Sequence, residues 1–124
     1  QLRSEMGKTE IASLIVTAAL IVMDYVTGLL KACMQHDISS AKMREGLYHK
    51  GAYVLVVALA EIIDTAQTYI NLGFSLPLVV TSCAYIVLTE MASVIENLGE
   101  INPELQGSRL LGMFRSDRES EADE

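Results

Sequence analysis

The sequence predicts an all-α integral membrane protein, a helical bundle of three transmembrane helices with a short αα-hairpin between the second and the third. Hydrophobic residues make up 51% of the chain and gather in three stretches. Each stretch is long enough to cross a hydrocarbon core of about 30 Å. Most charged residues, 9 basic and 16 acidic, lie outside them. We expect a transmembrane domain at 1–115, with spans at about 11–32, 51–71 and 75–98, and a disordered acidic tail at 116–124.

The first two spans differ in how well they suit lipid. Ile11–Leu30 contains one ionisable residue, Asp24, and is too long for the apolar core of a signal peptide, so we expect it to be retained. Ala52–Ile70 contains both Glu61 and Asp64. An acid near a helix centre costs about 2.5 to 3.5 kcal/mol on insertion, whereas an aliphatic residue contributes roughly −0.3 to −0.6 kcal/mol. The second helix therefore needs neighbours, water or protonation to shelter its carboxyl groups.

The third span is predicted to begin at a proline-containing turn. Ser75 is a candidate N-cap, and Pro77 would then occupy the first turn, where its missing N–H does little harm. The helix should end near Gly99. Because the link around Asn71–Gly73 is short, the second and third helices should run antiparallel as a hairpin.

The acidic end of the chain has no material for a core. Ser116–Glu124 holds five acids, one base and no large apolar residue, so it cannot offset the entropy cost of ordering. Cys33 and Cys83 lie in apolar helical surroundings without metal-ligand spacing. We expect packed free thiols, and neither a disulfide nor a metal site.

The distribution of basic residues predicts the orientation. With three spans, one side of the membrane receives seven Lys and Arg residues and the other receives two. The seven are Lys31, Lys42, Arg44, Lys50, Arg109, Arg115 and Arg118, and the two are Arg3 and Lys8. The positive-inside rule therefore places the C-terminus in the cytoplasm and the N-terminus outside.

Polar residues recur at helical spacing in all three spans, so each helix has one polar face. The candidates for these faces are Asp24, Thr27, Gly28, Glu61, Asp64, Glu90, Ser93, Glu96 and Asn97. One interpretation is that the faces meet inside the bundle and hydrogen-bond across helices. The other is that some of them line a water-filled lesion between subunits. Small residues such as Gly28 allow close approach of helices in either case.

The basic segment between the first two spans should lie on the inner membrane surface. Lys42, Arg44 and Lys50 would attract anionic lipid there, at roughly 1 kcal/mol each. The segment is too short and too poor in stacking side chains to indicate nucleic-acid binding. We find no catalytic, metal or cofactor motif, and expect no enzyme activity.

Four blocks of the sequence resemble a known family. They are Asp24-Tyr25-Val26-Thr27-Gly28, then Ser39-Ser40 followed by Gly46-Leu47 and Lys50, then Asp64, and finally Glu90 to Asn97, the most specific block. In this order and spacing the chain resembles the phage holin and toxin-secretion holin family, which includes lysis holins of Gram-positive phages. Two features depart from the family pattern. Thr89 stands where the family often has Asn, and the 23 residues before Asp24 are fewer than usual, so a further upstream segment would be in keeping with the family.

The resemblance implies a protein of the host bacterial cytoplasmic membrane that forms homo-oligomers and permeabilises the lipid bilayer. Its functional partner would be a released endolysin or toxin, without necessarily direct contact. Two alternatives remain open at this point. One is a small ion-conducting channel or transporter subunit that uses the intramembrane acids, and the other is a soluble helical module that buries its apolar faces in an oligomer.

Overall fold

The computed structural model describes residues 2–106 and residue 112, with side chains from residue 7 onward. The described chain forms four helices, α1 (Leu2–Met34), α2 (Ser40–Tyr69), α3 (Leu78–Ile101) and the short α4 (Pro103–Gln106). The described residues contain no strand, which confirms the predicted all-α class. The predicted tail at 116–124 lies outside the described residues.

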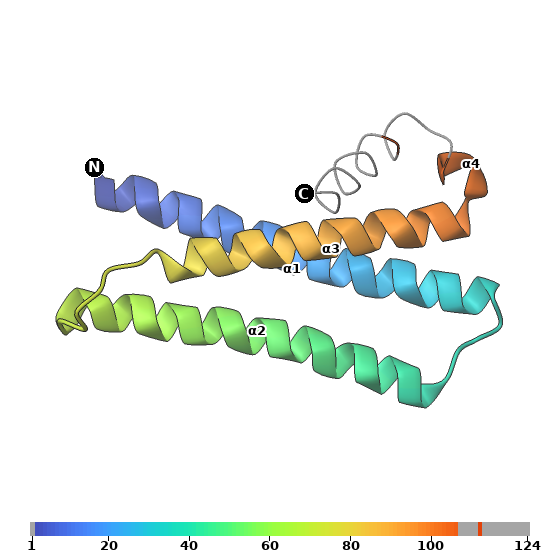
Figure 1. Ribbon diagram of the computed structural model, residues 1–124, viewed down its shortest axis with the longest axis horizontal. Coiled ribbons are helices and arrows are strands. Elements are labelled where there is room, and N and C mark those ends of the chain that lie inside the picture. The colour runs from blue at the N-terminus through green and yellow to red at the C-terminus, as the bar shows by residue number, and fades with distance from the viewer. Residues whose placement is uncertain (1, 107–111, 113–124) are drawn as a thin grey trace, which may run out of the picture.

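Helix α3 is the centre of the bundle. It packs along α1 and also against α2, whereas α1 and α2 have little direct contact with each other (Figure 1). Successive long helices run in opposite directions, and α2 and α3 form the predicted antiparallel hairpin (Figure 1). Three stretches, Gly7–Met34, Ser40–Tyr69 and Leu78–Ile101, are long and apolar enough to cross a membrane. This confirms the prediction of three transmembrane helices.

Helix α2 begins earlier than the sequence predicted. The expected span started near residue 51, but the helix starts at Ser40, where the Ser39 hydroxyl accepts a hydrogen bond from the Lys42 amide at 3.1 Å. A serine at this position satisfies one of the free amides of the first turn, which explains why the helix can extend into polar sequence. The basic segment is therefore largely helical, and the link from α1 is confined to residues 35–39.

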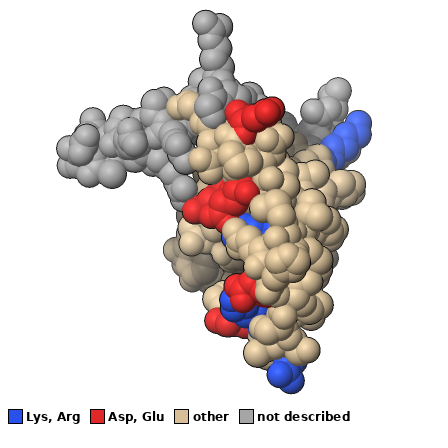
Figure 2. All heavy atoms as spheres, turned by 90° about the vertical axis from the view of Figure 1, so that its right-hand side faces the viewer, with Lys and Arg blue, Asp and Glu red and all other residues tan. Residues whose placement is uncertain are grey.

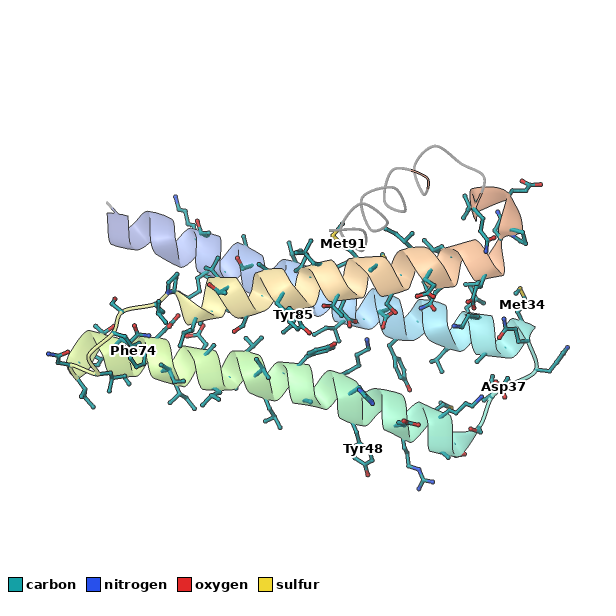
Figure 3. The ribbon with its side chains drawn as sticks, in the orientation of Figure 1. Met34, Asp37, Tyr48, Phe74, Tyr85 and Met91 are labelled. Carbon is teal, nitrogen blue, oxygen red and sulfur yellow. The ribbon has the colours of Figure 1, made fainter. Side chains whose placement is uncertain are left out.

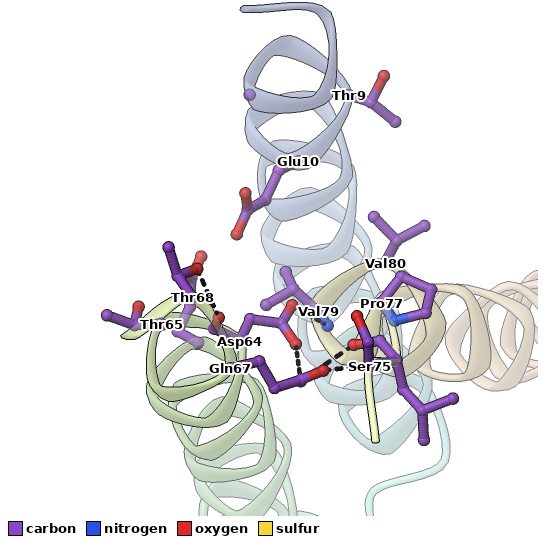
Figure 4. Close-up of a pocket in the computed structure, with 13 residues that line it drawn as sticks. Thr9, Glu10, Asp64, Thr65, Gln67, Thr68, Ser75, Pro77, Val79 and Val80 are labelled. Atoms are coloured by element: carbon purple, nitrogen blue, oxygen red, sulfur yellow. Dashed lines mark hydrogen bonds between the residues drawn. The ribbon is translucent and has the colours of Figure 1, made fainter. Parts of the chain in front are cut away.

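The N-terminus of α3 is capped by a residue of α2. The expected N-cap, Ser75, is not the cap, because α3 begins at Leu78 and Pro77 precedes it without a side-chain hydrogen bond. Instead, the Asp64 carboxylate accepts hydrogen bonds from the Leu78 and Val79 amides, both at 3.1 Å. Figure 4 shows Asp64 of α2 beside Val79. A carboxylate is well placed there because the N-terminus of a helix carries free N–H groups and partial positive charge.

Neighbouring contacts complete this turn. The Gln67 side chain accepts a hydrogen bond from the Leu76 amide at 2.6 Å and donates one to the Leu76 carbonyl at 3.1 Å. The Asn71 side chain accepts a hydrogen bond from the Gly73 amide at 3.0 Å. Gly73 has φ +81, a conformation that residues with a Cβ rarely adopt. The polar end of α2 thus fixes where the chain turns and where α3 begins.

The apolar core is small and lies along α3. Ala60, Val79 and Cys83 form a buried cluster against partly buried neighbours from α1 and α2, and Ile86 is fully buried one turn further along. Most other large apolar residues face outward, as Leu55 does with 70% of its surface exposed. Such an exterior suits lipid and does not suit water. Both cysteines are free thiols, but only Cys83 is buried as expected, and Cys33 is exposed.

We predict that Asp64→Ala loosens the start of α3. Removing a side-chain cap costs about 1 kcal/mol, because helix amides lose their acceptor. Hydrogen exchange of the protein in detergent micelles should therefore become faster at the Leu78 and Val79 amides. Glu45→Ala, which changes an exposed acid of α2, is the control and should leave those amides unchanged. Unaltered exchange in Asp64→Ala would show that the carboxylate is not the cap.

Candidate functional site

Polar side chains from all three long helices meet inside the bundle. Asp24 and Thr27 of α1 and Glu90 and Asn97 of α3 are buried, with 8% or less of each residue exposed. Lys50 of α2 reaches into the same place. We call these five residues, Asp24, Thr27, Lys50, Glu90 and Asn97, the ionic cluster.

Lys50 bridges two acidic side chains. Its ammonium group forms ion pairs with Asp24 on α1 and with Glu90 on α3. The side chains are shielded from the surroundings, with 16% of Lys50, 10% of Asp24 and 2% of Glu90 exposed. The ammonium also lies 5.9 Å from the centre of the Tyr53 ring, one turn further along α2. A single lysine thus connects all three helices.

Asn97 joins the cluster to the polar face of α1. Its amide nitrogen donates to the Asp24 carboxylate at 3.1 Å and to the Thr27 hydroxyl at 3.1 Å. The Thr27 hydroxyl in turn donates to the Met23 carbonyl at 2.9 Å. Gly28 lies beside this contact, since a Cβ there would be 3.8 Å from the Asn97 amide nitrogen. A methyl group at residue 28 would thus make an ordinary van der Waals contact with Asn97, so the packing of α1 on α3 leaves room for a small side chain there.

The ionic cluster lies within the three candidate membrane spans. Glu90 is close to the middle of the 24-residue helix α3. Lys50 is ten residues into α2, which corresponds to about 15 Å along the helix axis. Both groups therefore lie inside helices that are long and apolar enough to cross a membrane. Charged groups inside a membrane are costly unless they pair with one another.

A second polar region lies at the other end of the bundle, near the N-terminus of α1. An open groove of about 820 Å³ is lined there by Glu10, Glu61 and Asp64, among others (Figure 4). Glu61 and Asp64 are among the residues predicted from the sequence, whereas Glu10 is not. Glu10 falls one residue before the predicted span at 11–32, and it lines the groove because the N-terminal part of α1 lies near the C-terminal end of α2 and the start of α3.

Charged residues also pair at the end where α1 turns into α2. Lys31 forms an ion pair with Glu100 at 3.2 Å, and Lys42 pairs with Asp37 in the link. Figure 2 shows acidic and basic side chains side by side on this face. In Figure 3, Met34 and Asp37 mark this end and Phe74 marks the opposite one. The two polar ends therefore enclose the central cluster.

The remaining predicted residues occupy different surroundings. Ser93 lines a groove of about 410 Å³ between α1 and α2, which also borders Asp24 and Lys50. Glu96 and Arg44 are exposed. Lys50 was expected on the membrane surface with Lys42 and Arg44, and this expectation was wrong. Because α2 begins at Ser40, Lys50 lies within the helix, and it faces inward, where it forms ion pairs with Asp24 and Glu90.

The geometry keeps charged and polar side chains paired inside the bundle. Among the described residues that are not exposed, every buried side-chain nitrogen or oxygen atom has a hydrogen-bond partner. No group of three or more His, Cys, Asp and Glu side chains in the described part of the chain could hold a metal ion. What the arrangement provides is a set of paired charges inside a bundle whose exterior is apolar.

We predict that Lys50→Met destabilises the fold more than removing the charges of Asp24, Lys50 and Glu90 together. The single change leaves two carboxylates buried without a cation, which costs roughly 3 to 5 kcal/mol. The triple variant Asp24→Asn, Lys50→Met, Glu90→Gln removes the charges together and should recover most of that loss. The free energy of unfolding in mixed micelles, followed by circular dichroism, measures both.

The matched control is Lys42→Met. Its ion pair with Asp37 is exposed, with 61% of the Lys42 side chain accessible, so its loss should cost at most about 1 kcal/mol. A triple variant as unstable as Lys50→Met would contradict the assignment of the loss to unpaired charge.

Comparison with known proteins places the chain in a family. Residues 5–107 match the bacteriophage holin family. An uncharacterized protein of Halalkalibacterium halodurans is 28% identical over 82 residues, which cover 66% of this chain and 61% of that protein. The chain thus spans less than two thirds of this relative's length. No solved structure matches this chain. With the family match covering most of the sequence and three helices able to cross a bilayer, the chain belongs to the bacteriophage holin family and is a multi-pass membrane protein.

Proposed function

We propose that this protein acts as a holin. It accumulates in the cytoplasmic membrane of a bacterial host, assembles with copies of itself and makes the membrane permeable. A phage endolysin or a toxin then escapes and the host lyses, without any need for direct contact between holin and cargo. Family membership and the three membrane-spanning helices support this proposal.

The observation that carries the proposal is the groove at the N-terminal end of α1. Glu10 and Glu61 lie within candidate membrane spans and line a groove that is open to the surroundings. Carboxylates at such positions are costly in lipid unless water or another polar surface covers them. A second copy, or water held between copies, would supply that cover. We therefore propose that the groove, rather than the ionic cluster, contributes to the lesion between subunits.

A channel for small ions is the second candidate. The same groove favours it, because Glu10, Glu61 and Asp64 together would attract cations. The two candidates differ in the size of solute that passes. The soluble module considered from the sequence fits less well with membership of the bacteriophage holin family and with three helices able to cross a membrane.

We predict that proteoliposomes containing the protein release fluorescent dextrans as well as ions. Glu61→Gln should reduce this release, because it removes a charge that draws water into the assembly. Glu45→Gln, an exposed change near the other end of α2, is the control and should release dextran like the unmodified protein. Release of ions with complete retention of every dextran would favour the ion channel instead.

We propose that the C-terminus faces the cytoplasm. The balance of basic residues supports this orientation even without Lys50, which lies inside the bundle. The α1–α2 link would then be cytoplasmic, and the α2–α3 turn would be external.

The orientation predicts a labelling pattern in protoplasts that are labelled before permeabilisation, while their membrane still excludes an impermeant dye. In a Cys33→Ala, Cys83→Ala background, a membrane-impermeant maleimide should react with Leu72→Cys in the external turn. It should react with Glu104→Cys in α4 only after the membrane is opened with detergent. The reverse pattern would contradict the proposed orientation.

A further inference from the structure

Helix α2 is attached to the rest of the bundle in two different ways. At its C-terminal end, Asp64 and Gln67 form hydrogen bonds with the backbone of the turn and the first residues of α3. The backbone groups in these hydrogen bonds belong to Leu76, Leu78 and Val79. The chain itself also connects α2 to α3 here through residues 70–77. This end can act as a hinge because it keeps its partners while α2 changes its angle.

Further along α2, toward its N-terminus, the attachment depends on Lys50. Its ammonium group bridges Asp24 on α1 and Glu90 on α3. Apolar packing between α1 and α2 is limited in this half, since the two helices have little direct contact and the Tyr25 ring of α1 lies beside Gly46, which has no side chain to pack against it. The groove of about 410 Å³ between α1 and α2 borders Lys50 directly. A charged contact, rather than a packed core, therefore holds this part of α2.

The link between α1 and α2 contains slack. Backbone hydrogen bonds fold its first residues back onto the last turn of α1, and the Asp37 amide donates to the Ala32 carbonyl at 2.9 Å. Residues 35–39 would span up to about 17 Å if extended. The N-terminal end of α2 can therefore move away from α1 without unwinding either long helix.

We propose that Lys50 is a latch that keeps α2 closed on the α1–α3 pair. When its two ion pairs break, the N-terminal half of α2 swings outward about the turn at residues 70–77. The groove between α1 and α2 then widens, and Asp24 and Glu90 become accessible to water or to a second copy of the chain. That last consequence rests on the proposed function, whereas the movement itself concerns a single chain.

Distances between pairs of spin labels in lipid nanodiscs test the latch. One pair uses the exposed native Cys33 on α1 with Leu47→Cys on α2, in a Cys83→Ala background. The second pair, Tyr69→Cys with Val80→Cys in a Cys33→Ala, Cys83→Ala background, reports on the hinge. In Lys50→Met, the first pair should shift to longer and broader distances, and the second should keep its distance. Dilution with unlabelled protein restricts the measurement to single chains.

Two control variants sharpen the result. Lys50→Arg retains a cation and should keep the closed distance, and Lys42→Met removes an exposed ion pair and should also keep it. An unchanged first pair in Lys50→Met would overturn the latch. Equal lengthening of both pairs would overturn it as well, because it would indicate general loss of the bundle. Since no leakage is measured, failure of the proposed permeabilisation would leave this result unaffected.

Discussion

The structure depends on one constraint, that charge inside a hydrocarbon layer must be paired within the protein. Lys50 lies between Asp24 and Glu90, and so brings one charged residue from each long helix to a common point. Because an unpaired carboxylate inside a membrane is costly, the three helices cannot separate freely once they are in lipid. The pairing thus does for this bundle what a large apolar core does for a soluble protein.

The small apolar core and the apolar exterior follow from the same constraint. Lipid tails are as apolar as leucine, so burial of aliphatic side chains gives little drive for helices to associate. The chain accordingly leaves residues such as Leu55 and Ile62 outside, at 70% and 66% exposure, and packs polar groups inside. Two grooves leave polar groups of the bundle uncovered. One is bordered by Glu61, and the other runs from the α1–α2 link to Lys50.

Hydropathy and helical periodicity were sufficient to predict the three helices and the hairpin, and they placed Asp24, Thr27, Glu90 and Asn97 on polar helix faces. They left open whether those faces meet inside the bundle or line a lesion between subunits. They were not sufficient for Lys50, because a basic residue next to an apolar stretch is read as a surface anchor unless the true start of the helix is known. The cap of α3 by Asp64 was missed for a related reason. The sequence offers the nearby Ser75, whereas the distant acid reaches the helix only after the hairpin has formed.

The ion pairs of Lys50 can be measured directly in a bilayer. Solid-state NMR of protein labelled with ¹⁵N at lysine side chains and ¹³C at aspartate and glutamate carboxyls reports which ammonium and carboxyl groups are in contact. Subtracting the spectrum of Lys50→Met isolates the contribution of this residue. The account predicts dipolar coupling from Lys50 to both Asp24 and Glu90. A Lys50 ammonium that is coupled to neither carboxyl group in lipid would contradict it.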